Sequence, residues 1–511
     1  MDGGWVMDLE LRGITKKFPG VVANDDVNLK LATGEVLALI GENGAGKSTL
    51  MSILYGMYRP DGGTILIDGV ERTFSSPADA IAAGIGMVHQ HFMLVPNFTV
   101  AENVVLGVEP TGRLGSLDID EARRMVKEIS DRYGLELDPD AVIEELPVGV
   151  QQRVEIVKVL LRDAKVVVFD EPTAVLTPKE IVEFFAIVRT LNEAGRGVVF
   201  ITHKLKEALT IAHRISVLRR GKVVGEVLPA ATTESQIAEM MVGRPVQLTA
   251  SKAARAPGEV MLAVENLQVV DPDGRAVVDG VSFVVRAGEI VGIAGVQGNG
   301  QTELVDAITG LRAAASGSIT VAGDDVTDDD PRERHVKGMA HIPEDRQRQG
   351  LVGALSVAEN LVLTRYHDAE FRRGVTVDWE TAHEVAEKLI SEYDIRTPSA
   401  DVGVGTLSGG NQQKVIVARE LSRDLKVSVA SQPTRGVDVG SIEYIHSRIV
   451  EERDAGTAVL IVSTELDEVM ALSDRLLVMY RGSIVADLDP KQVSAMDVGL
   501  YMAGSRPGGA A

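Results

Sequence analysis

The feature that most limits what this chain can fold into is a long internal repeat. A glycine-rich segment, GENGAGKST from Gly41, returns as GVQGNGQTE from Gly295, an offset of 254 positions. The flanking sequence keeps that offset, since LKLATGEVLALI precedes the first copy and FVVRAGEIVGIA precedes the second. Further along, LPVGVQQRVEI from Leu146 matches LSGGNQQKVIV from Leu407 at an offset of 261. Two constant offsets separated by one small length change indicate a duplicated domain with an insertion.

The stretch between the two copies has the composition of a linker. Residues 244–260, RPVQLTASKAARAPGEV, are rich in small residues and show no apolar period. We therefore predict domains at residues 6–245 and 259–505, joined by a linker at 246–258.

Each half alternates short apolar runs with segments of helical spacing. GEVLALIG, KVVVFDEP and GVVFITH are typical of buried strands, and KSTLMSILYGM after the first glycine loop has the spacing of a helix. Strands that alternate with helices predict a parallel sheet with crossover helices. The segment 95–165 is more helical and is expected to form a subdomain of its own. The predicted class is α/β, with two tandem domains that each have a mixed or parallel sheet core and a helical subdomain.

Composition excludes several classes of protein. The 511 residues carry a net charge of −22, so no global positive field exists to attract nucleic acid. There is no cysteine, which excludes disulfides, thiolate metal sites and a cysteine nucleophile. The longest apolar runs fall far short of the roughly 20 residues that span a bilayer, and MDGGWVMDLELRG at the N-terminus lacks the pattern of a signal peptide. We expect a chain that does not cross a membrane by itself.

The first glycine-rich segment has the residues of a complete phosphate-binding loop. Gly41, Gly44 and Gly46 allow consecutive backbone N–H groups to surround an anion at the start of a helix. Lys47 can reach the β- and γ-phosphates, and the Ser48 hydroxyl can ligate Mg²⁺. The segment lies between a predicted strand and a predicted helix, as this function requires. A glycine-rich turn without ligand is the alternative, and this context disfavours it.

Two carboxylates and a histidine follow later predicted strands of the first half. Asp170 and Glu171 end VVVFDE, where the first suits metal binding and the second suits activation of water. His203 ends VVFITH. A lone histidine is more often a packed or surface residue, but its place downstream of the paired carboxylates favours a functional role.

Together these motifs resemble the ATP-binding-cassette (ABC) ATPases, and the resemblance covers both halves. GENGAGKST is similar to the Walker A motif of that family, VVVFDEP to Walker B and LSGGNQQK to the signature. Gln90 stands at the position of the Q-loop glutamine and His203 at that of the switch histidine. Phe18 lies 29 residues before Lys47, near where the family often stacks adenine on an aromatic ring; the alternative is that Phe18 belongs to the core.

The resemblance assigns roles residue by residue. The implied catalytic residues are Glu171, His203 and Gln90. The implied metal ligands are Ser48, Gln90 and Asp170. The implied ATP-binding residues are Phe18, Gly41, Glu42, Asn43, Gly44, Ala45, Gly46, Lys47, Ser48, Thr49, Ser408, Gly409, Gly410 and Asn411.

In this family each ATP lies between the Walker A motif of one cassette and the signature of the other, so the motifs must be compared crosswise. The first ATP site, defined here as the first half's Walker residues with the second half's signature, is complete. The second ATP site has lost the phosphate-binding lysine, both Walker B acids and the histidine. It combines Gln301, Thr302, Glu344, Ser431, Gln432 and Thr464 with Pro147 and Val148. All the losses fall on one composite site, so we expect one site that hydrolyses ATP and one that does not.

A fused pair of cassettes without membrane spans resembles the ATPase subunit of bacterial importers for monosaccharides and nucleosides. GMVHQHFMLVPNFTVAENVVLG and GVQGNGQTEL are most similar to the nucleoside branch. The resemblance implies ATP and Mg²⁺ as cofactors, polytopic membrane permease subunits as partners, and a peripheral position on the cytoplasmic face of the cell membrane. An extracellular or periplasmic solute-binding protein is an indirect partner, and no nucleic acid is expected. The alternatives are an importer ATPase for a monosaccharide such as ribose or galactose, and a soluble twin-cassette factor in translation or DNA repair.

Overall fold

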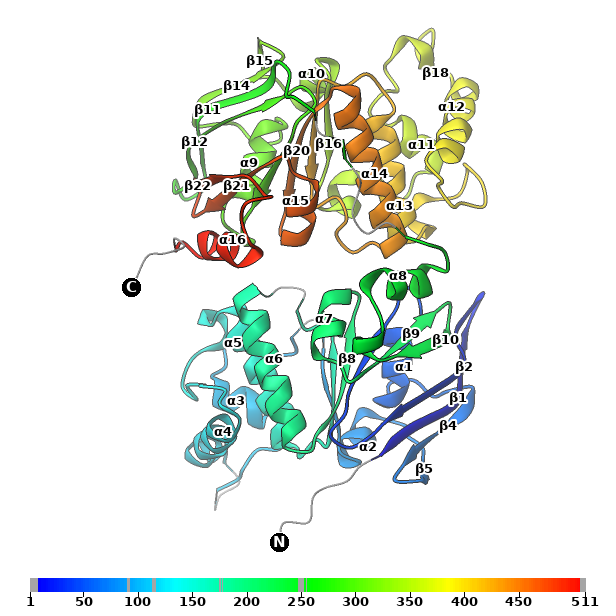
Figure 1. Ribbon diagram of the computed structural model, residues 1–511, viewed down its shortest axis with the longest axis vertical. Helices are drawn as coiled ribbons and strands as arrows, with labels where there is room; N and C mark the ends of the chain where they lie inside the picture. The colour runs from blue at the N-terminus through cyan, green and yellow to red at the C-terminus, as the bar shows by residue number, and fades with distance from the viewer. Residues whose placement is uncertain are drawn as a thin grey trace. The chain divides into compact units, whose positions relative to one another are not determined.

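The computed structural model of the protein describes residues 8–89, 92–112, 116–173, 176, 178–246, 252–253 and 255–505. The chain divides into two compact units, Met1–Val246 and Gln247–Ala511. Both units have the same architecture (Figure 1). Within the described residues no helix is both long and apolar enough to span a membrane.

The first unit is built on a six-stranded sheet with the order β10-β9-β3-β8-β7-β6. All neighbouring pairs are parallel except β9 and β10. Every residue of β3 and β8 is buried, because both faces of this sheet are covered. The strands are β3 (Val36–Ile40), β6 (Ile85–Val88), β7 (Val166–Asp170), β8 (Gly197–Thr202), β9 (Arg214–Arg219) and β10 (Lys222–Val227).

A four-stranded antiparallel sheet, with the order β2-β1-β4-β5, packs against the same unit. Leu9, Leu11 and Ile14 of β1 are buried while Arg12 is exposed, so one face of this sheet meets the core. The sequence did not predict this sheet as a separate layer. Its strands are β1 (Leu9–Phe18), β2 (Val21–Leu31), β4 (Gly62–Ile67) and β5 (Val70–Arg72).

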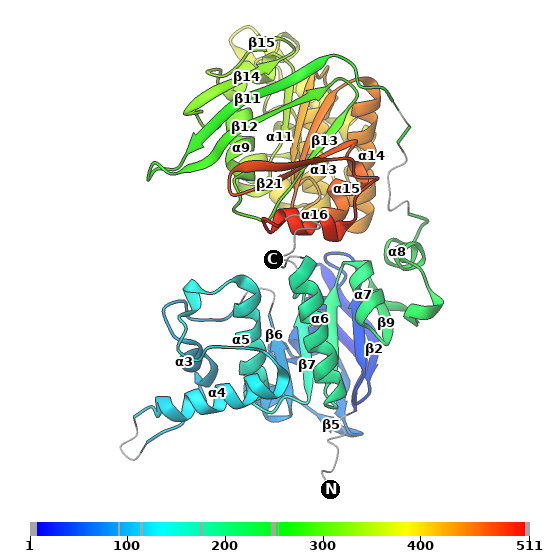
Figure 2. The same ribbon diagram turned by 60° about the vertical axis from the view of Figure 1, so that its left-hand side comes forward.

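The helices of the first unit fall into two groups. The helices α3, α4 and α5 gather at the side of the first unit away from β2 (Figure 2), and their apolar faces share one core with α6, β7 and β8. The helix α1 packs into a second core beneath the antiparallel sheet. The helices are α1 (Lys47–Leu54), α2 (Pro77–Ala82), α3 (Val100–Val105), α4 (Ile119–Tyr133), α5 (Val148–Leu161), α6 (Pro178–Glu193), α7 (Leu205–Ile211) and α8 (Glu234–Val242), with the 3₁₀ turns η1 (Ile143–Glu145) and η2 (Pro229–Ala231).

The second unit repeats both sheets. Its six-stranded sheet has the order β16-β19-β20-β13-β21-β22, and its antiparallel sheet the order β12-β11-β14-β15. The strands of the first are β13 (Ile290–Ala294), β16 (Met339–Ile342), β19 (Val427–Ser431), β20 (Ala458–Ser463), β21 (Arg475–Tyr480) and β22 (Ser483–Leu488). The strands of the second are β11 (Val260–Val270), β12 (Ala276–Arg286), β14 (Ser316–Val321) and β15 (Asp324–Asp325). A small hairpin of β17 (Arg372–Arg373) and β18 (Thr376–Val377) has been added.

The helices of the second unit occupy the corresponding places. They are α9 (Gln301–Ile308), α10 (Pro331–Val336), α11 (Val357–Val362), α12 (Trp379–Glu392), α13 (Gly409–Leu421), α14 (Val439–Ala455), α15 (Leu466–Leu472) and α16 (Ala495–Met502). Shorter turns are η3 (Arg346–Gly350), η4 (Ala369–Phe371) and η5 (Val404–Thr406). The predicted strands at GEVLALIG, KVVVFDEP and GVVFITH are confirmed as β3, β7 and β8, and the predicted α/β core with a helical subdomain is confirmed in both units.

Candidate functional site

The phosphate loop of the first unit lies between β3 and α1. Its backbone requires glycine at two positions for steric reasons. A Cβ added at Gly41 would come 2.3 Å from the carbonyl oxygen of Leu218, and one at Gly46, where φ is +105°, would come 2.2 Å from that of Ala23. The loop therefore packs between β2 and β9, which fixes the start of α1; the first N–H groups of a helix have no partner within the helix and suit an anion.

Lys47 is the first residue of α1 and its side chain turns back over the loop. Its Nζ donates to the carbonyl oxygens of Gly41, at 2.7 Å, and Glu42, at 3.0 Å. Burial lowers the pKa of Lys47, and the charges of Glu171, Asp170 and Glu42 oppose that shift. The lysine and the two carboxylates thus share one electrostatic environment, although Lys47 is more than 120 residues away from them in sequence.

Asp170 and Glu171 meet this loop because β7, β8 and β3 are neighbours in a parallel sheet. Asp170 is the last residue of β7. Burial, together with the charge of Glu171, raises its pKa to about 6, while Lys47 acts in the opposite direction. Glu171 adopts a left-handed conformation with φ +46°, and its backbone N–H donates to the carbonyl of Ile201 at 3.0 Å. The chain therefore turns sharply at Glu171 while staying attached to β8.

His203 follows β8 and contacts the same carboxylate. Its Nδ1 lies 3.1 Å from Oε1 of Glu171. Burial alone would raise the pKa of Glu171, but the hydrogen bond and charge of His203, with Lys47 and Lys204, lower it overall. Because the ionised carboxylate of Glu171 can only accept, Nδ1 of His203 carries a hydrogen and donates a hydrogen bond to it. The structure thus brings together Lys47, Asp170, Glu171 and His203, as the sequence predicted. Gln90 lies outside the described residues.

Phe18 is not a core residue. It ends β1 with 38 % of its surface exposed, and its ring meets Tyr58 edge-on with the centroids 5.6 Å apart. The hairpin that begins at Phe18 continues into β2, where Asn24 donates to the carbonyl of Gly46 at 3.1 Å. The adenine-stacking hypothesis therefore has an exposed aromatic pair, of which Phe18 belongs to a hairpin that contacts the phosphate loop and Tyr58 to the segment between α1 and β4. Sequence reasoning missed both Tyr58 and Asn24, because neither belongs to a recognisable motif.

The second unit has the same backbone at its phosphate loop with different chemistry. Gln301 is the first residue of α9, is buried, and follows Gly300 at φ +100°. Thr302 donates from Oγ1 to Oε2 of Glu344 at 3.2 Å, and Arg435 forms an ion pair with the other oxygen at 2.5 Å. The carboxylate at the Q-loop position is therefore bound within the unit itself.

Neutral groups also replace the acid, the base and the histidine. Ser431 ends β19, and Gln432 repeats the left-handed turn with φ +48° and a 2.7 Å hydrogen bond to the carbonyl of Val462. Oε1 of Gln432 accepts from Ser463 Oγ at 3.3 Å and from the backbone N–H and hydroxyl of Thr464 at 3.2 and 3.3 Å. An amide held this way cannot take a proton from water.

The two signature turns also differ, and here the second unit has the intact motif. In the second unit Ser408 is exposed at the N-cap of α13, and Gly410 admits no side chain, since a Cβ would come 2.3 Å from Ser441 Oγ. In the first unit Pro147 is the N-cap of α5 and Val148 its first residue; neither α5 nor α13 has a side-chain hydrogen bond at its N-cap. Proline offers neither a hydroxyl nor an N–H to a phosphate.

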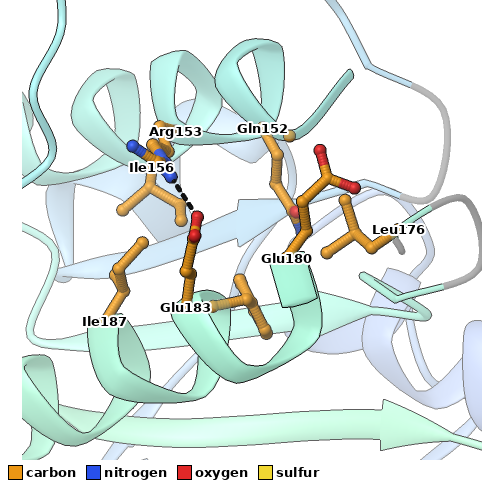
Figure 3. A pocket seen from close by; sticks show the side chains of 9 residues that line it. Gln152, Arg153, Ile156, Leu176, Glu180, Glu183 and Ile187 are labelled. Atoms are coloured by element: carbon orange, nitrogen blue, oxygen red, sulfur yellow. Dashed lines mark hydrogen bonds and ion pairs between the residues drawn. The ribbon is translucent and has the colours of Figure 1, made fainter. Parts of the chain in front are cut away.

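A small hollow in the first unit lies behind its signature turn and not at the phosphate loop. It is lined by α5 and α6, where Arg153 and Glu183 form a 2.7 Å ion pair (Figure 3). Glu180 approaches Gly149 there, so that a Cβ on this glycine would come 2.7 Å from its carboxylate. None of the residues that line this hollow was predicted to bind ATP.

Comparison with known proteins identifies relatives of the whole chain. Residues 24–174 and 278–435 match the family described as ABC transporter. The chain is 47% identical over 496 residues to the nucleoside import ATP-binding protein NupA of Lactococcus lactis, covering 97% of this chain and 98% of that protein. It is 47% identical to the guanosine import ATP-binding protein NupO of Bacillus subtilis, covering 97% of each. It is 44% identical to the ribose import ATP-binding protein RbsA 1 of Rubrobacter xylanophilus, covering 97% of this chain and 98% of that protein.

Proposed function

This chain belongs to the ABC transporter family as a protein with two ATP-binding cassettes, and we propose that it is the ATPase subunit of a nucleoside importer. The observation that carries the proposal is the contrast between its two units. In the first, Lys47, Asp170, Glu171 and His203 share one charged environment. In the second, the backbone is the same but Gln432 at the corresponding turn is neutral and already hydrogen-bonded. Hydrolysis of ATP is therefore assigned to the first unit.

In the proposed mechanism the chain's own residues divide the work. The phosphate loop and Lys47 hold the β- and γ-phosphates of ATP. Glu171 orients and polarises the attacking water, since its carboxylate is ionised. His203 holds that carboxylate in place through Nδ1. Gln90 is proposed to contribute at the Q-loop position.

Asp170 and Ser48 fit a magnesium ion. Asp170 is a partly buried carboxylate whose pKa is raised by burial and by Glu171, so a cation beside it would relieve an unfavourable charge. No group of three or more His, Asp or Glu side chains in the described residues could hold a metal ion. Mg²⁺ commonly uses one or two protein oxygens together with substrate phosphates and waters. Bound Mg²⁺ would neutralise charge on the phosphates.

We further propose that the signature of the second unit, Ser408, Gly409 and Gly410, completes the ATP site of the first. The support is the distribution of the motifs between the units. The first unit has intact Walker residues but Pro147 in its signature, whereas the second has altered Walker residues and an intact signature with Ser408. Ser408→Arg should then stop turnover, although it changes the unit without Walker residues. Pro147→Arg is the matched control and should have a much smaller effect. Equal loss in both variants would reject the crossed arrangement.

Nucleosides are favoured as the solute, and a monosaccharide such as ribose is the second candidate. The support is that two relatives at 47% identity are named nucleoside and guanosine import proteins, while a glucose import protein is 46% identical and a ribose import protein 44%. The partners would be polytopic permease subunits and, indirectly, a solute-binding protein, which would place this chain on the cytoplasmic face of the membrane. A soluble factor in translation or DNA repair would need no such partners.

The test is to purify the chain with the membrane proteins that bind it, reconstitute the complex and measure ATP turnover with added solute-binding protein. We expect stimulation by a nucleoside such as guanosine and little by ribose. Stimulation by ribose alone would select the monosaccharide importer. Turnover in the absence of any membrane partner, with no partner recovered, would reject an importer.

A further inference from the structure

Arg346 lies against the signature turn of the second unit, although no motif includes it. It begins η3, the short turn that follows β16, and its Nη1 donates to the carbonyl of Arg435 at 2.8 Å. Its Nη1 and Nη2 would each lie 3.6 Å from a Cβ on Gly436. One guanidinium therefore joins the segment after β16 to the turn at Arg435 and Gly436.

The same guanidinium contacts the first glycine of the signature. A Cβ on Gly409 would come 2.7 Å from Nη2 of Arg346 and 3.2 Å from its Cζ. The absence of a side chain at Gly409 thus makes room for the arginine, as well as leaving the first turn of α13 open to an anion. Nε of Arg346 is buried and has no hydrogen-bond partner among the described residues. A buried orphan donor is costly unless something offsets it.

The first unit provides an internal comparison. Four residues after β16 stands Arg346, and four residues after β6 stands Phe92. The signature position of Gly409 is Val148 in the first unit. The guanidinium and the glycine that accommodates it are therefore present together in one unit and absent together from the other. The unit that keeps both is the one with the intact signature serine.

We propose that Arg346 is a positioning residue for ATP hydrolysis, which holds the Ser408–Gly410 turn in the form that binds the γ-phosphate. This inference rests on the proposed function, in which that signature serves the ATP held by Lys47. Arg346 acts through the backbone of Gly409 and through the turn at Gly436. Arg346 lies two residues after Glu344, which stands at the Q-loop position of the second ATP site.

The test compares Arg346→Ala, Arg346→Met and Arg346→Lys in the assembled transporter. Methionine keeps the packing volume but has no donors, so Arg346→Met tests the idea even if the alanine variant folds poorly. For both we expect kcat and kcat/KM for ATP to fall together by about tenfold or more, since the lost interaction acts in the transition state. Arg346→Lys should recover part of the loss. Arg348→Ala removes an exposed arginine from the same turn and is the control, with turnover like that of the wild type.

Two readouts separate positioning from general structural damage. Equilibrium ATP binding by the full chain and its thermal unfolding should stay unchanged in Arg346→Met. Gly409→Ala should lower turnover less in the Arg346→Ala background than in the wild type, because the clashing Nη2 is gone. Wild-type turnover in Arg346→Met, or equal effects of Gly409→Ala in both backgrounds, would overturn the inference. Suppose that Arg346→Met turns over ATP like the wild type. If Ser408→Arg is active as well, the proposed function itself fails; if Ser408→Arg is inactive, only the role of Arg346 is rejected.

Discussion

Restoring the missing lysine in the second phosphate loop should not create a second active site. Gln301→Lys returns one charge to a site that also lacks an acid at Ser431, a carboxylate at Gln432 and a signature serine at Pro147. We expect unchanged ATP turnover, even if nucleotide occupancy per chain rises through the added phosphate contact. We also expect a second effect, on the stability of the second unit.

The stability effect follows from the surroundings of Lys47. Burial lowers its pKa, and three carboxylates, Glu171, Asp170 and Glu42, partly offset this. In the second unit the corresponding residues are Gln432, Ser431 and Val296. A lysine at position 301 would be buried as Gln301 is, without any of those three charges.

The magnitude is the difference between two opposing terms. Burying an ammonium group costs several kcal/mol after relaxation. A hydrogen bond from the ammonium group to a backbone carbonyl, of the kind that Lys47 makes, returns about 1.5–3 kcal/mol. We therefore expect Gln301→Lys to lower the free energy of unfolding of the second unit by about 1–3 kcal/mol at pH 7. The unfolded state binds the proton more tightly, so this loss should shrink as the pH rises toward the ordinary lysine pKa of about 10.4.

The assay is urea unfolding without nucleotide at pH 7 and pH 9, together with turnover in the transporter. Gln301→Met is the control, since it removes the amide without adding a charge. The double variant Gln301→Lys/Gln432→Glu should regain stability, because the carboxylate is restored. Wild-type stability in Gln301→Lys would refute the reasoning about charge. A doubling of turnover would show that Gln301 alone had silenced the second site.

Two further predictions concern buried charges. Asp170→Asn should abolish turnover yet raise the free energy of unfolding of the nucleotide-free chain by about 1–2 kcal/mol at pH 7. The folded-state pKa of Asp170, about 6, lies above the usual 3.8, so the stability of the wild type falls as the pH rises between these two values. The gain in the variant, measured by thermal unfolding, should therefore vanish below about pH 4. Arg453→Met should destabilise the second unit by about 3 kcal/mol in urea unfolding, because the buried arginine pairs with Asp474 and donates to the carbonyl of Ala253. The control Arg132→Met removes an exposed ion pair and should change the free energy of unfolding by under about 0.5 kcal/mol.

The sequence could predict those site residues whose positions follow directly from the order of the strands. Asp170 ends β7, Glu171 and His203 directly follow β7 and β8, and Lys47 follows the glycine loop after β3; parallel strands bring such ends to one edge of a sheet. Their neighbourhood therefore follows from the order of apolar runs. The repeat offset then identified the neutral counterparts at Gln301 and Gln432 without any structural information.

The residues that the sequence missed depend on contacts between distant segments. Asn24 donates a hydrogen bond to Gly46 from an antiparallel sheet that was not predicted separately, and the ring of Tyr58, from the segment between α1 and β4, contacts Phe18. Arg346 contacts Gly409, which lies 63 positions later in the sequence. Its proposed role follows only from this contact, where a Cβ on the glycine would clash with the guanidinium. Such pairings depend on tertiary packing, for which alternation and motif spacing carry no signal.

The most direct test of a single hydrolytic site uses two residues with the same backbone. Glu171 and Gln432 both follow the last residue of a central strand, both adopt a left-handed φ, of +46° and +48°, and both donate a backbone hydrogen bond to the next strand. ATP turnover per transporter should be measured for Glu171→Gln and Gln432→Ala side by side, with ATP binding checked in each. We predict that Glu171→Gln loses at least about a hundredfold in kcat, while Gln432→Ala stays within about twofold of the wild type. Persistent turnover in Glu171→Gln, or an equal loss in Gln432→Ala, would contradict the account.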